Sequence, residues 1–306
     1  MSFVQAVGGN FLSKKLMLIL NPAAGNGGGL LSIGPAMEVL YKGGFVPTVF
    51  YTGASGEATR LVLEHALDFD CVVCVGGDGT LSETVAGLAQ LESPPPLGYI
   101  PQGTANDVAV SLNIPRKPVQ AAKVIVDGHP REQDVGKFND SDYFTYIAAF
   151  GAFTEVSYET PRENKQTLGH LAYVLQGMSQ LPKITPYHTT VEYDGGIIED
   201  DLIFGGVSNT KSVGGIVKLK KLGIELNDGL FEVTLVRNPA NVIEMNKIVS
   251  DVLTQNFRGN QVMMFQSKEV KFTFDKPVKW TRDGEAGGAH QVVRLENRHS
   301  AIRFLA

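Results

Sequence analysis

A glycine-rich turn that carries one carboxylate offers the clearest candidate chemistry in this 306-residue sequence. Gly76, Gly77 and Gly79 follow the apolar run 71–75, and Asp78 lies between them. A glycine loop that leads into a helix presents free N–H groups and the positive end of the helix dipole, which together bind phosphate. The Asp78 carboxylate would repel phosphate unless it orients a ribose, a Mg²⁺-bound water or another ligand group. The alternative is an ordinary turn in which Asp78 caps the helix.

Two further loops carry polar groups that suit a nucleotide. In Gly103–Asp107, the side chains of Thr104, Asn106 and Asp107 can hydrogen-bond a nucleotide or a metal-bound water. The alternative is that Asn106 or Asp107 only caps the next helix. The loop Asn21–Gly29 is rich in glycine, but it has the spacing of neither a Walker P-loop nor the dinucleotide-binding fingerprint.

Two Asp-Gly turns later in the chain add carboxylates. Asp283-Gly284-Glu285 places two of them on a tight turn, where one can accept a proton from a substrate hydroxyl as a general base. A surface hairpin turn is the alternative. The segment Glu225–Leu230 resembles a cation loop, in which Asp228 and nearby main-chain carbonyls hold a hard divalent ion. A bare Asp-Gly turn would look the same.

Repeated strand–loop–helix units must position the first three loops. This pattern is typical of an open, mostly parallel α/β sheet, in which the ligand binds beyond the carboxyl ends of the strands. Thr80 and Glu83 have the spacing of a capping box, which predicts a helix that starts there. The expected strands are 15–20, 46–51, 71–75 and 97–101, and the expected helices are about 30–42, 57–67, 81–91 and one after residue 107.

The pattern changes near residue 129, where alternating strands and Gly, Asp or Asn turns begin. We therefore predict a β-rich second domain at 129–294. The first domain covers 1–128 and regains the last strand, 301–305, within a returning segment 295–306. The expected strands of the second domain are 143–149, 188–193, 201–207, 230–236, 269–274, 277–281 and 291–295, with helices at about 167–181 and 239–257.

Charge and composition exclude several classes of protein. The formal net charge is −5, whereas nucleic-acid binding normally requires a basic face. No apolar segment approaches the roughly 18 residues of a membrane span. Lys14 and Lys15 before the run 16–20 imitate a signal peptide, but the run is short enough to be a core strand. Cys71 and Cys74 fall on opposite faces of a strand, which predicts buried, inert thiols in a cytoplasmic protein.

The motifs in their order resemble the diacylglycerol kinase catalytic family. Leu20–Gly25, Gly76–Thr80, Gly103–Asp107 and Asp283–Glu285 carry the resemblance, which spans about residues 15–305. It is closest to the soluble bacterial lipid kinases, and sphingosine and ceramide kinases are more distant. NAD kinases share the motif at Gly76–Thr80 but lack those at Gly103–Asp107 and Asp283–Glu285. The resemblance implies an α/β domain and a β-sandwich domain, with ATP and a lipid meeting in the cleft.

The resemblance also implies a role for individual residues. Asp78 and Asp107 would organise Mg²⁺-ATP. The implied nucleotide-binding residues are Asn21, Pro22, Ala23, Ala24, Gly25, Thr52, Gly76, Gly77, Asp78, Gly79, Thr80, Leu81, Ser82, Thr104, Asn106 and Asp107.

Further implied roles lie in the second domain. Asp283 and Glu285 match the catalytic carboxylates, with Glu285 as the base that deprotonates the lipid hydroxyl. Asp134 matches an acidic residue that braces the site. The implied ligands of a structural Mg²⁺ are Asp228 and the carbonyl oxygens of Glu225 and Leu230.

Four positions depart from the family pattern. Ser82 stands where the family usually has Asn, and Val110 stands where a basic residue commonly occurs. Leu219–Gly223 replaces a Pro-containing lead to the Asp-Gly turn, and Arg282 replaces an apolar residue.

We therefore expect an ATP- and Mg²⁺-dependent lipid kinase of the cytoplasm that works at the membrane surface. Diacylglycerol is the leading acceptor, followed by phosphatidylglycerol or a sphingoid base. A kinase of NAD-kinase type that phosphorylates a soluble metabolite is one alternative. A non-catalytic nucleotide- or lipid-binding regulator is another, although the four aspartates and glutamates of the motifs speak against it. A homodimer is left open.

Overall fold

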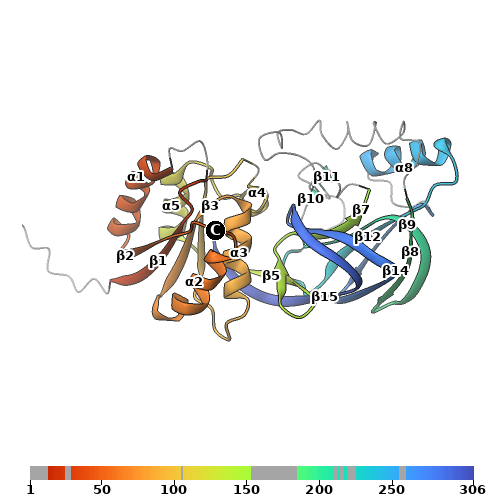
Figure 1. The fold of residues 1–306 in the computed structure, drawn as a ribbon. Coiled ribbons are helices and arrows are strands. Elements are labelled where there is room, and N and C mark those ends of the chain that lie inside the picture. The colour runs from red at the N-terminus through yellow and green to blue at the C-terminus, as the bar shows by residue number, and fades with distance from the viewer. Residues whose placement is uncertain are drawn as a thin grey trace, which may run out of the picture.

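The computed structural model describes residues 13–24, 29–104, 106–152, 185–209, 212–213, 217–218, 225–254 and 260–306. It has an α/β half, which contains the C-terminus, and a β-rich half (Figure 1). The predicted fold class, an α/β domain followed by a β-rich sandwich, is confirmed. Gly25, the helix predicted at 167–181 and the segment 219–223 lie outside the described residues.

Four parallel strands form the sheet of the α/β half in the order β2-β1-β3-β4. Leu16–Leu20 and the whole of β3 are buried, because helices cover both faces of the sheet. These strands are β1 (Lys14–Leu20), β2 (Phe45–Tyr51), β3 (Cys71–Gly76) and β4 (Leu97–Pro101).

The helices pack in two pairs, α1 with α5 and α2 with α3 (Figure 1). They are α1 (Gly29–Lys42), α2 (Glu57–His65), which continues into the 3-10 turn η1 (Ala66–Asp68), α3 (Asp78–Leu88), α4 (Asp107–Leu112) and α5 (Pro118–Asp127).

The predicted start of α3 is wrong by three residues, because the helix begins at Asp78 rather than at 81. Its N-cap is Gly77, which has no side chain to make a cap hydrogen bond. The expected capping box does not form. Glu83 instead accepts hydrogen bonds from the N–H groups of Gly56 (2.8 Å) and Ala58 (3.2 Å), so it fixes the start of the neighbouring helix α2.

The β-rich half wraps antiparallel strands around a large apolar core, and a smaller apolar cluster packs α8 against the sheet. β9, β7, β14 and β8 close a ring of strand pairings, and Phe150, Phe272 and Trp280 pack inside it. The elements are β5 (Pro130–Phe138), β6 (Asp142–Phe144), β7 (Ile147–Gly151), β8 (Tyr187–Tyr193), β9 (Gly196–Ser208), β10 (Ser212–Val213), β11 (Val217–Lys218), β12 (Phe231–Arg237), α8 (Val242–Thr254), β13 (Val262–Ser267), β14 (Glu269–Arg282) and β15 (Glu285–Leu305).

Strand β15 joins the two halves. The sequence predicts separate strands at 291–295 and 301–305, but one strand runs from Glu285 to Leu305. It pairs with β14 and β5 in the β-rich half, and Phe304 lies opposite Leu97 of β4. Ile302, Phe304 and Leu305 belong to the apolar core of the α/β half. One hydrogen-bonded sheet therefore runs through both halves of the described chain.

Cys71 and Cys74 are buried and free, as expected. Burial raises the pKa of each thiol to about 12, so neither is a reactive thiolate. No helix among the described ranges has the length and apolar character to span a membrane.

Candidate active site

The glycine turn after β3 presents one carboxylate at the N-terminus of α3. Asp78 is the first residue of this helix, where backbone N–H groups lack intrahelical partners. Its Oδ2 accepts a hydrogen bond from the N–H of Asn106 (2.7 Å). Its Oδ1 is buried and has no hydrogen-bond partner among the residues that the structure describes. Burial, aided by the charge of Asp107, raises the pKa of Asp78 to about 6.

The two polar loops that follow β3 and β4 pack backbone against backbone. A Cβ atom added to Gly103 would lie 2.7 Å from the Cα of Gly77, so only glycine fits there. Asn106 is almost fully buried in the left-handed conformation (φ 54°). Its side chain accepts from the N–H of Gly103 (2.9 Å) and the hydroxyl of Tyr99 (3.1 Å), and it donates to the Gly103 carbonyl (2.7 Å). The amide of Asn106 therefore holds the loop, and its predicted contact with a nucleotide stays a prediction.

The loop after β1 lies beside the same turn. Asn21 donates from Nδ2 to Oγ1 of Thr80 (3.0 Å), and its Oδ1 accepts from the N–H of Ala23 (2.9 Å). Thr52, at the end of β2, is buried and its N–H donates to the carbonyl of Leu20 (3.0 Å). The loops at the carboxyl ends of β1, β2, β3 and β4 therefore gather at one edge of the sheet, as the sequence predicts.

The turn between β14 and β15 brings a second carboxylate against α3. Asp283 is buried with a positive φ of 48°. Its Oδ2 accepts from the hydroxyl of Ser82 (2.9 Å) and the N–H of Thr145 (2.7 Å). Its Oδ1 accepts from the N–H groups of Tyr146 (3.0 Å) and Ile147 (3.1 Å). Burial raises the pKa of Asp283, and these four donors act in the opposite direction by stabilising the charged form.

These contacts hold Asp283 between the two halves of the molecule. Ser82 belongs to α3, whereas Thr145–Ile147 belongs to the connection between β6 and β7 and to the start of β7. Ser82, which differs from the Asn usual in the family, therefore supplies a hydroxyl that donates a hydrogen bond to the buried carboxylate of Asp283. The departure at Arg282 is also explained by a contact, since its guanidinium forms an ion pair with Asp142 of β6 (3.0 Å).

Glu285, the first residue of β15, is exposed and faces the glycine turn. A Cβ atom added to Gly79 would lie 3.8 Å from Oε1 of Glu285. The carboxylate on the β-rich half thus reaches the helix N-terminus on the α/β half. Its exposure differs from the burial of Asp283, so the two carboxylates of the Asp-Gly-Glu turn have different environments.

The acidic side chains fit a Mg²⁺ ion that arrives with phosphate. Asp78 offers its buried Oδ1, and burial raises the pKa of the neighbouring Asp107. Among the described residues, no group of three or more His, Cys, Asp or Glu side chains is arranged to hold a metal by itself. Mg²⁺ is commonly bound through one or two carboxylates together with substrate phosphates and waters. Asp78 and Asp107 meet that requirement.

The predicted structural Mg²⁺ site centres on an exposed turn. Asp228 accepts a hydrogen bond from the N–H of Leu230 (3.0 Å), which closes the turn. Asp134 is fully buried, and it accepts from the N–H groups of Gly229 (2.7 Å) and Ser300 (2.7 Å). Asp134 therefore ties this turn to β15. The assignment of Asp228, with the carbonyls of Glu225 and Leu230, as metal ligands stays a prediction.

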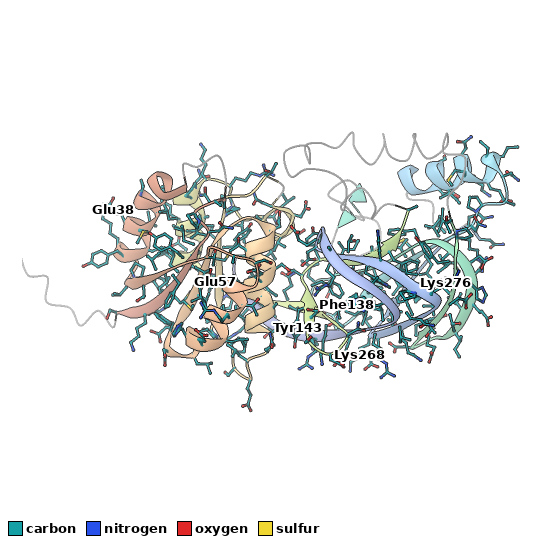
Figure 2. The ribbon with its side chains drawn as sticks, in the orientation of Figure 1. Glu38, Glu57, Phe138, Tyr143, Lys268 and Lys276 are labelled. Carbon is teal, nitrogen blue, oxygen red and sulfur yellow. The ribbon has the colours of Figure 1, made fainter. Side chains whose placement is uncertain are left out.

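Sequence reasoning missed several groups that build the site. The donors to Asp283 from residues 145–147 are backbone amides, which carry no signal in the residue types. Glu57, which Figure 2 labels, closes the loop after β2 by accepting from the N–H groups of Gly53 (2.7 Å) and Ala54 (3.3 Å). A glutamate in the first turn of a predicted helix was a usable signal for this contact.

Comparison with known proteins supports the family that the sequence motifs predict. The family model described as the diacylglycerol kinase catalytic domain matches residues 15–138. A second, described as the YegS C-terminal NAD kinase beta sandwich-like domain, matches residues 150–305. A diacylglycerol kinase of Bacillus subtilis (strain 168) is 34% identical over 278 residues, which cover 90% of this chain and 91% of that protein. One of Staphylococcus carnosus (strain TM300) is 33% identical over 280 residues, covering 90% of each.

A solved structure extends the likeness to the arrangement of both halves. The crystal structure of a diacylglycerol kinase from Bacillus anthracis str. Sterne has a TM-score of 0.75 and 25% identity, and it covers 96% of each chain. The two family models together span most of the chain, and the ordered motifs lie in loops that contact the turn Gly76–Thr80 or face it. The chain therefore belongs to the diacylglycerol kinase catalytic family.

Proposed function

We propose that this kinase transfers the γ-phosphate of ATP, with Mg²⁺, to the hydroxyl of a lipid at the membrane surface. Diacylglycerol, which would become phosphatidic acid, is the leading acceptor because the relatives named above are diacylglycerol kinases. The observation that carries the proposal is the approach of the Glu285 carboxylate to Gly79 at the N-terminus of α3.

The α/β half would bind the nucleotide. The N–H groups of the turn Gly76–Thr80 and the N-terminus of α3 attract phosphate oxygens. The loop after β1, which begins at Asn21, and the loop after β4, which ends at Asp107, border this turn. Thr52 lies at the same edge of the sheet. Asp78 and Asp107 would hold Mg²⁺, which supplies charge neutralisation to the transferred phosphoryl group.

Glu285 is the proposed general base. Its carboxylate accepts the proton of the lipid hydroxyl while the hydroxyl oxygen forms a bond to the γ-phosphorus. The bond between that phosphorus and the β,γ-bridging oxygen breaks, and its electron pair leaves with ADP. Asp283 already accepts four hydrogen bonds, so its proposed role is to position the turn that carries Glu285.

The remaining assignments extend this proposal. The nucleotide domain would comprise 1–128 with 295–306, and the lipid domain would comprise 129–294. A cation at Asp228 would stiffen the turn that Asp134 connects to β15.

The proposal is tested by incubating the protein with labelled ATP, Mg²⁺ and lipids in mixed micelles. The lipids are diacylglycerol, phosphatidylglycerol and a sphingoid base, and NAD is the soluble control acceptor. We expect label in phosphatidic acid. Label in a different lipid would correct the acceptor, and label only in NAD would overturn the lipid assignment. ATP binding without any product would favour a regulator.

A further inference from the structure

Tyr146 connects the two halves of the site, although no motif points to it. It lies between β6 and β7, where its N–H donates to Oδ1 of Asp283 (3.0 Å). Its carbonyl accepts from the N–H of Asn209 (3.0 Å). Its half-buried side chain packs against the apolar core of the α/β half. The backbone of Tyr146 is thus fixed in the β-rich half while its ring contacts the other half.

The Tyr146 side chain lies between Asp283, which the N–H of the same residue contacts, and the core of the α/β half. It is close enough to Asp283, Asp107, Asp78 and Glu285 to be affected by the charge of each. Burial, followed by these four charges, raises the pKa of Tyr146 well above its usual value. The phenol therefore keeps its proton at neutral pH.

A donor at this place has a chemical use. Ionised carboxylates only accept hydrogen bonds, and a phosphoryl group that enters between them brings more negative charge. The hydroxyl of Ser82 and the N–H groups of Thr145–Ile147 already donate to Asp283. The hydrogen bonds of Tyr146 within the described chain run through its backbone N–H and carbonyl. Its O–H is therefore able to donate to a substrate oxygen.

We propose that Tyr146 is a further functional residue, whose O–H donates a hydrogen bond to an oxygen of the phosphoryl group as it passes from the nucleotide to the acceptor. This rests on the proposed phosphoryl transfer. The tyrosine gives up no proton, since Glu285 receives the proton of the acceptor hydroxyl. Its contribution is electrostatic, like that of an oxyanion-hole donor.

The variant Tyr146→Phe removes the hydroxyl and keeps the ring. Tyr143→Phe is the matched control, because Tyr143 is also half-buried and packs against the same apolar core, near the boundary of the two halves (Figure 2). Loss of one preorganised donor typically lowers kcat by about 10²-fold. We expect a fall of that order for Tyr146→Phe, with KM for ATP changed by less than about threefold. Tyr143→Phe should stay within about twofold of the parent. Parent-like kcat in Tyr146→Phe would overturn the proposal.

A spectroscopic measurement separates this inference from the identity of the acceptor. In protein labelled with ¹³C at tyrosine Cζ, the Tyr146 resonance is assigned by its absence from Tyr146→Phe. Addition of Mg²⁺ and a non-hydrolysable ATP analogue should shift this resonance and leave that of Tyr143 in place. A Tyr146 resonance that does not move would contradict the inference. Failure of the parent protein to phosphorylate any lipid would instead refute the proposed function, while the resonance would still report on Tyr146.

Discussion

The turns Asp283-Gly284-Glu285 and Asn227-Asp228-Gly229 differ in what surrounds their aspartates. Both place a glycine with a φ near +80° directly after the aspartate, 80° for Gly284 and 78° for Gly229. Asp228 is exposed and accepts a hydrogen bond from within its own turn. Asp283 is buried and accepts four hydrogen bonds from other segments. An Asp-Gly pair thus predicts a turn, and the role of its carboxylate is decided by residues far away in the chain.

The largest effect is expected at Glu285. Glu285→Gln removes the proposed base and keeps the size of the side chain, so kcat should fall by about 10²–10⁴-fold. ATP binding, measured by calorimetry, should be unchanged. Glu269→Gln, at another exposed glutamate of the β-rich half, is the control and should keep parent activity. Retained turnover in Glu285→Gln would remove Glu285 from the chemistry.

Asp283→Asn tests the buried turn directly. One oxygen becomes an amide NH₂ that faces N–H or O–H donors, and buried unsatisfied groups cost about 1–3 kcal/mol each. The free energy of unfolding in urea should therefore fall by about 2–4 kcal/mol, with loss of activity. Asp228→Asn, measured in EDTA, should change it by less than about 0.5 kcal/mol. Equal losses in the two variants would contradict the comparison.

Asp78 extends the comparison to a buried carboxylate, one oxygen of which has no hydrogen-bond partner within the described part of the chain. Its pKa is raised from 3.8 to about 6 in the folded protein, so the unfolded chain ionises first. Folding stability is therefore lost as pH rises from about 4 through about 6, with an upper limit of about 3 kcal/mol. Asp78→Asn should remove this loss of folding stability with rising pH, because the amide does not ionise.

The measurement for Asp78→Asn is urea unfolding at pH 5 and pH 8 without Mg²⁺ or ATP. The variant should be more stable than the parent at pH 8, and its advantage should shrink at pH 5. Mg²⁺-ATP-dependent turnover should be lost. A variant that is less stable than the parent at pH 8 would show that the carboxylate is satisfied in the folded state.

Ser82→Ala removes one of the four donors to Asp283. The remaining three donors are backbone amides, so we expect a cost of about 1–2 kcal/mol in unfolding free energy. The double variant with Asp283→Asn supplies the test. Because Asp283→Asn weakens the Ser82–Asp283 hydrogen bond, Ser82→Ala should cost less unfolding free energy in the Asp283→Asn background than in the parent. Additive losses would argue against the contact.

The smallest effect concerns the exposed turn and a bound cation. If Asp228 binds Mg²⁺, millimolar Mg²⁺ should raise the melting temperature of the parent by a few degrees and leave Asp228→Asn unchanged. The titration uses the nucleotide-free protein, because the proposed Mg²⁺ at Asp78 arrives only with substrate phosphate. Asp78→Asn is therefore the control and should keep the shift. An equal Mg²⁺ response in Asp228→Asn and the parent would remove this metal assignment.

The sequence was a good guide where one segment determines its own structure. The buried strands of the α/β half and the loops at their carboxyl ends are close to their predicted places, because apolar runs and glycine turns are local signals. β5 and β13 were not predicted. The exposed start of β5, at Pro130–Glu132, carries charged residues and lies opposite the end of β15, so it depends on a partner.

Dependence on other segments also explains why the start of α3 and its capping box were predicted wrongly. Thr80 and Glu83 have the capping-box spacing, but Asn21 and the start of α2 compete for their side chains. Likewise, nothing in the residue types of 145–147 announces the amide groups that hold Asp283. Local patterns predicted the loops of the site, whereas the contacts that orient its carboxylates come from other segments, 28 residues away for Asp78 and Asn106 and 201 residues away for Asp283 and Ser82.

The irregularity in β15 has a mechanical consequence. This strand is long enough to extend about 70 Å along its path, and it links the turn of Glu285 to the core of the α/β half. Its pairing with β5 is interrupted between Arg298 and Ile302, where Ser300 has a φ of 51°. Asp134 holds the N–H of Ser300 at this interruption. A rotation that opens or closes the two halves would thus have its hinge at Ser300. Asp134 would hold the backbone of Ser300 in place during that rotation.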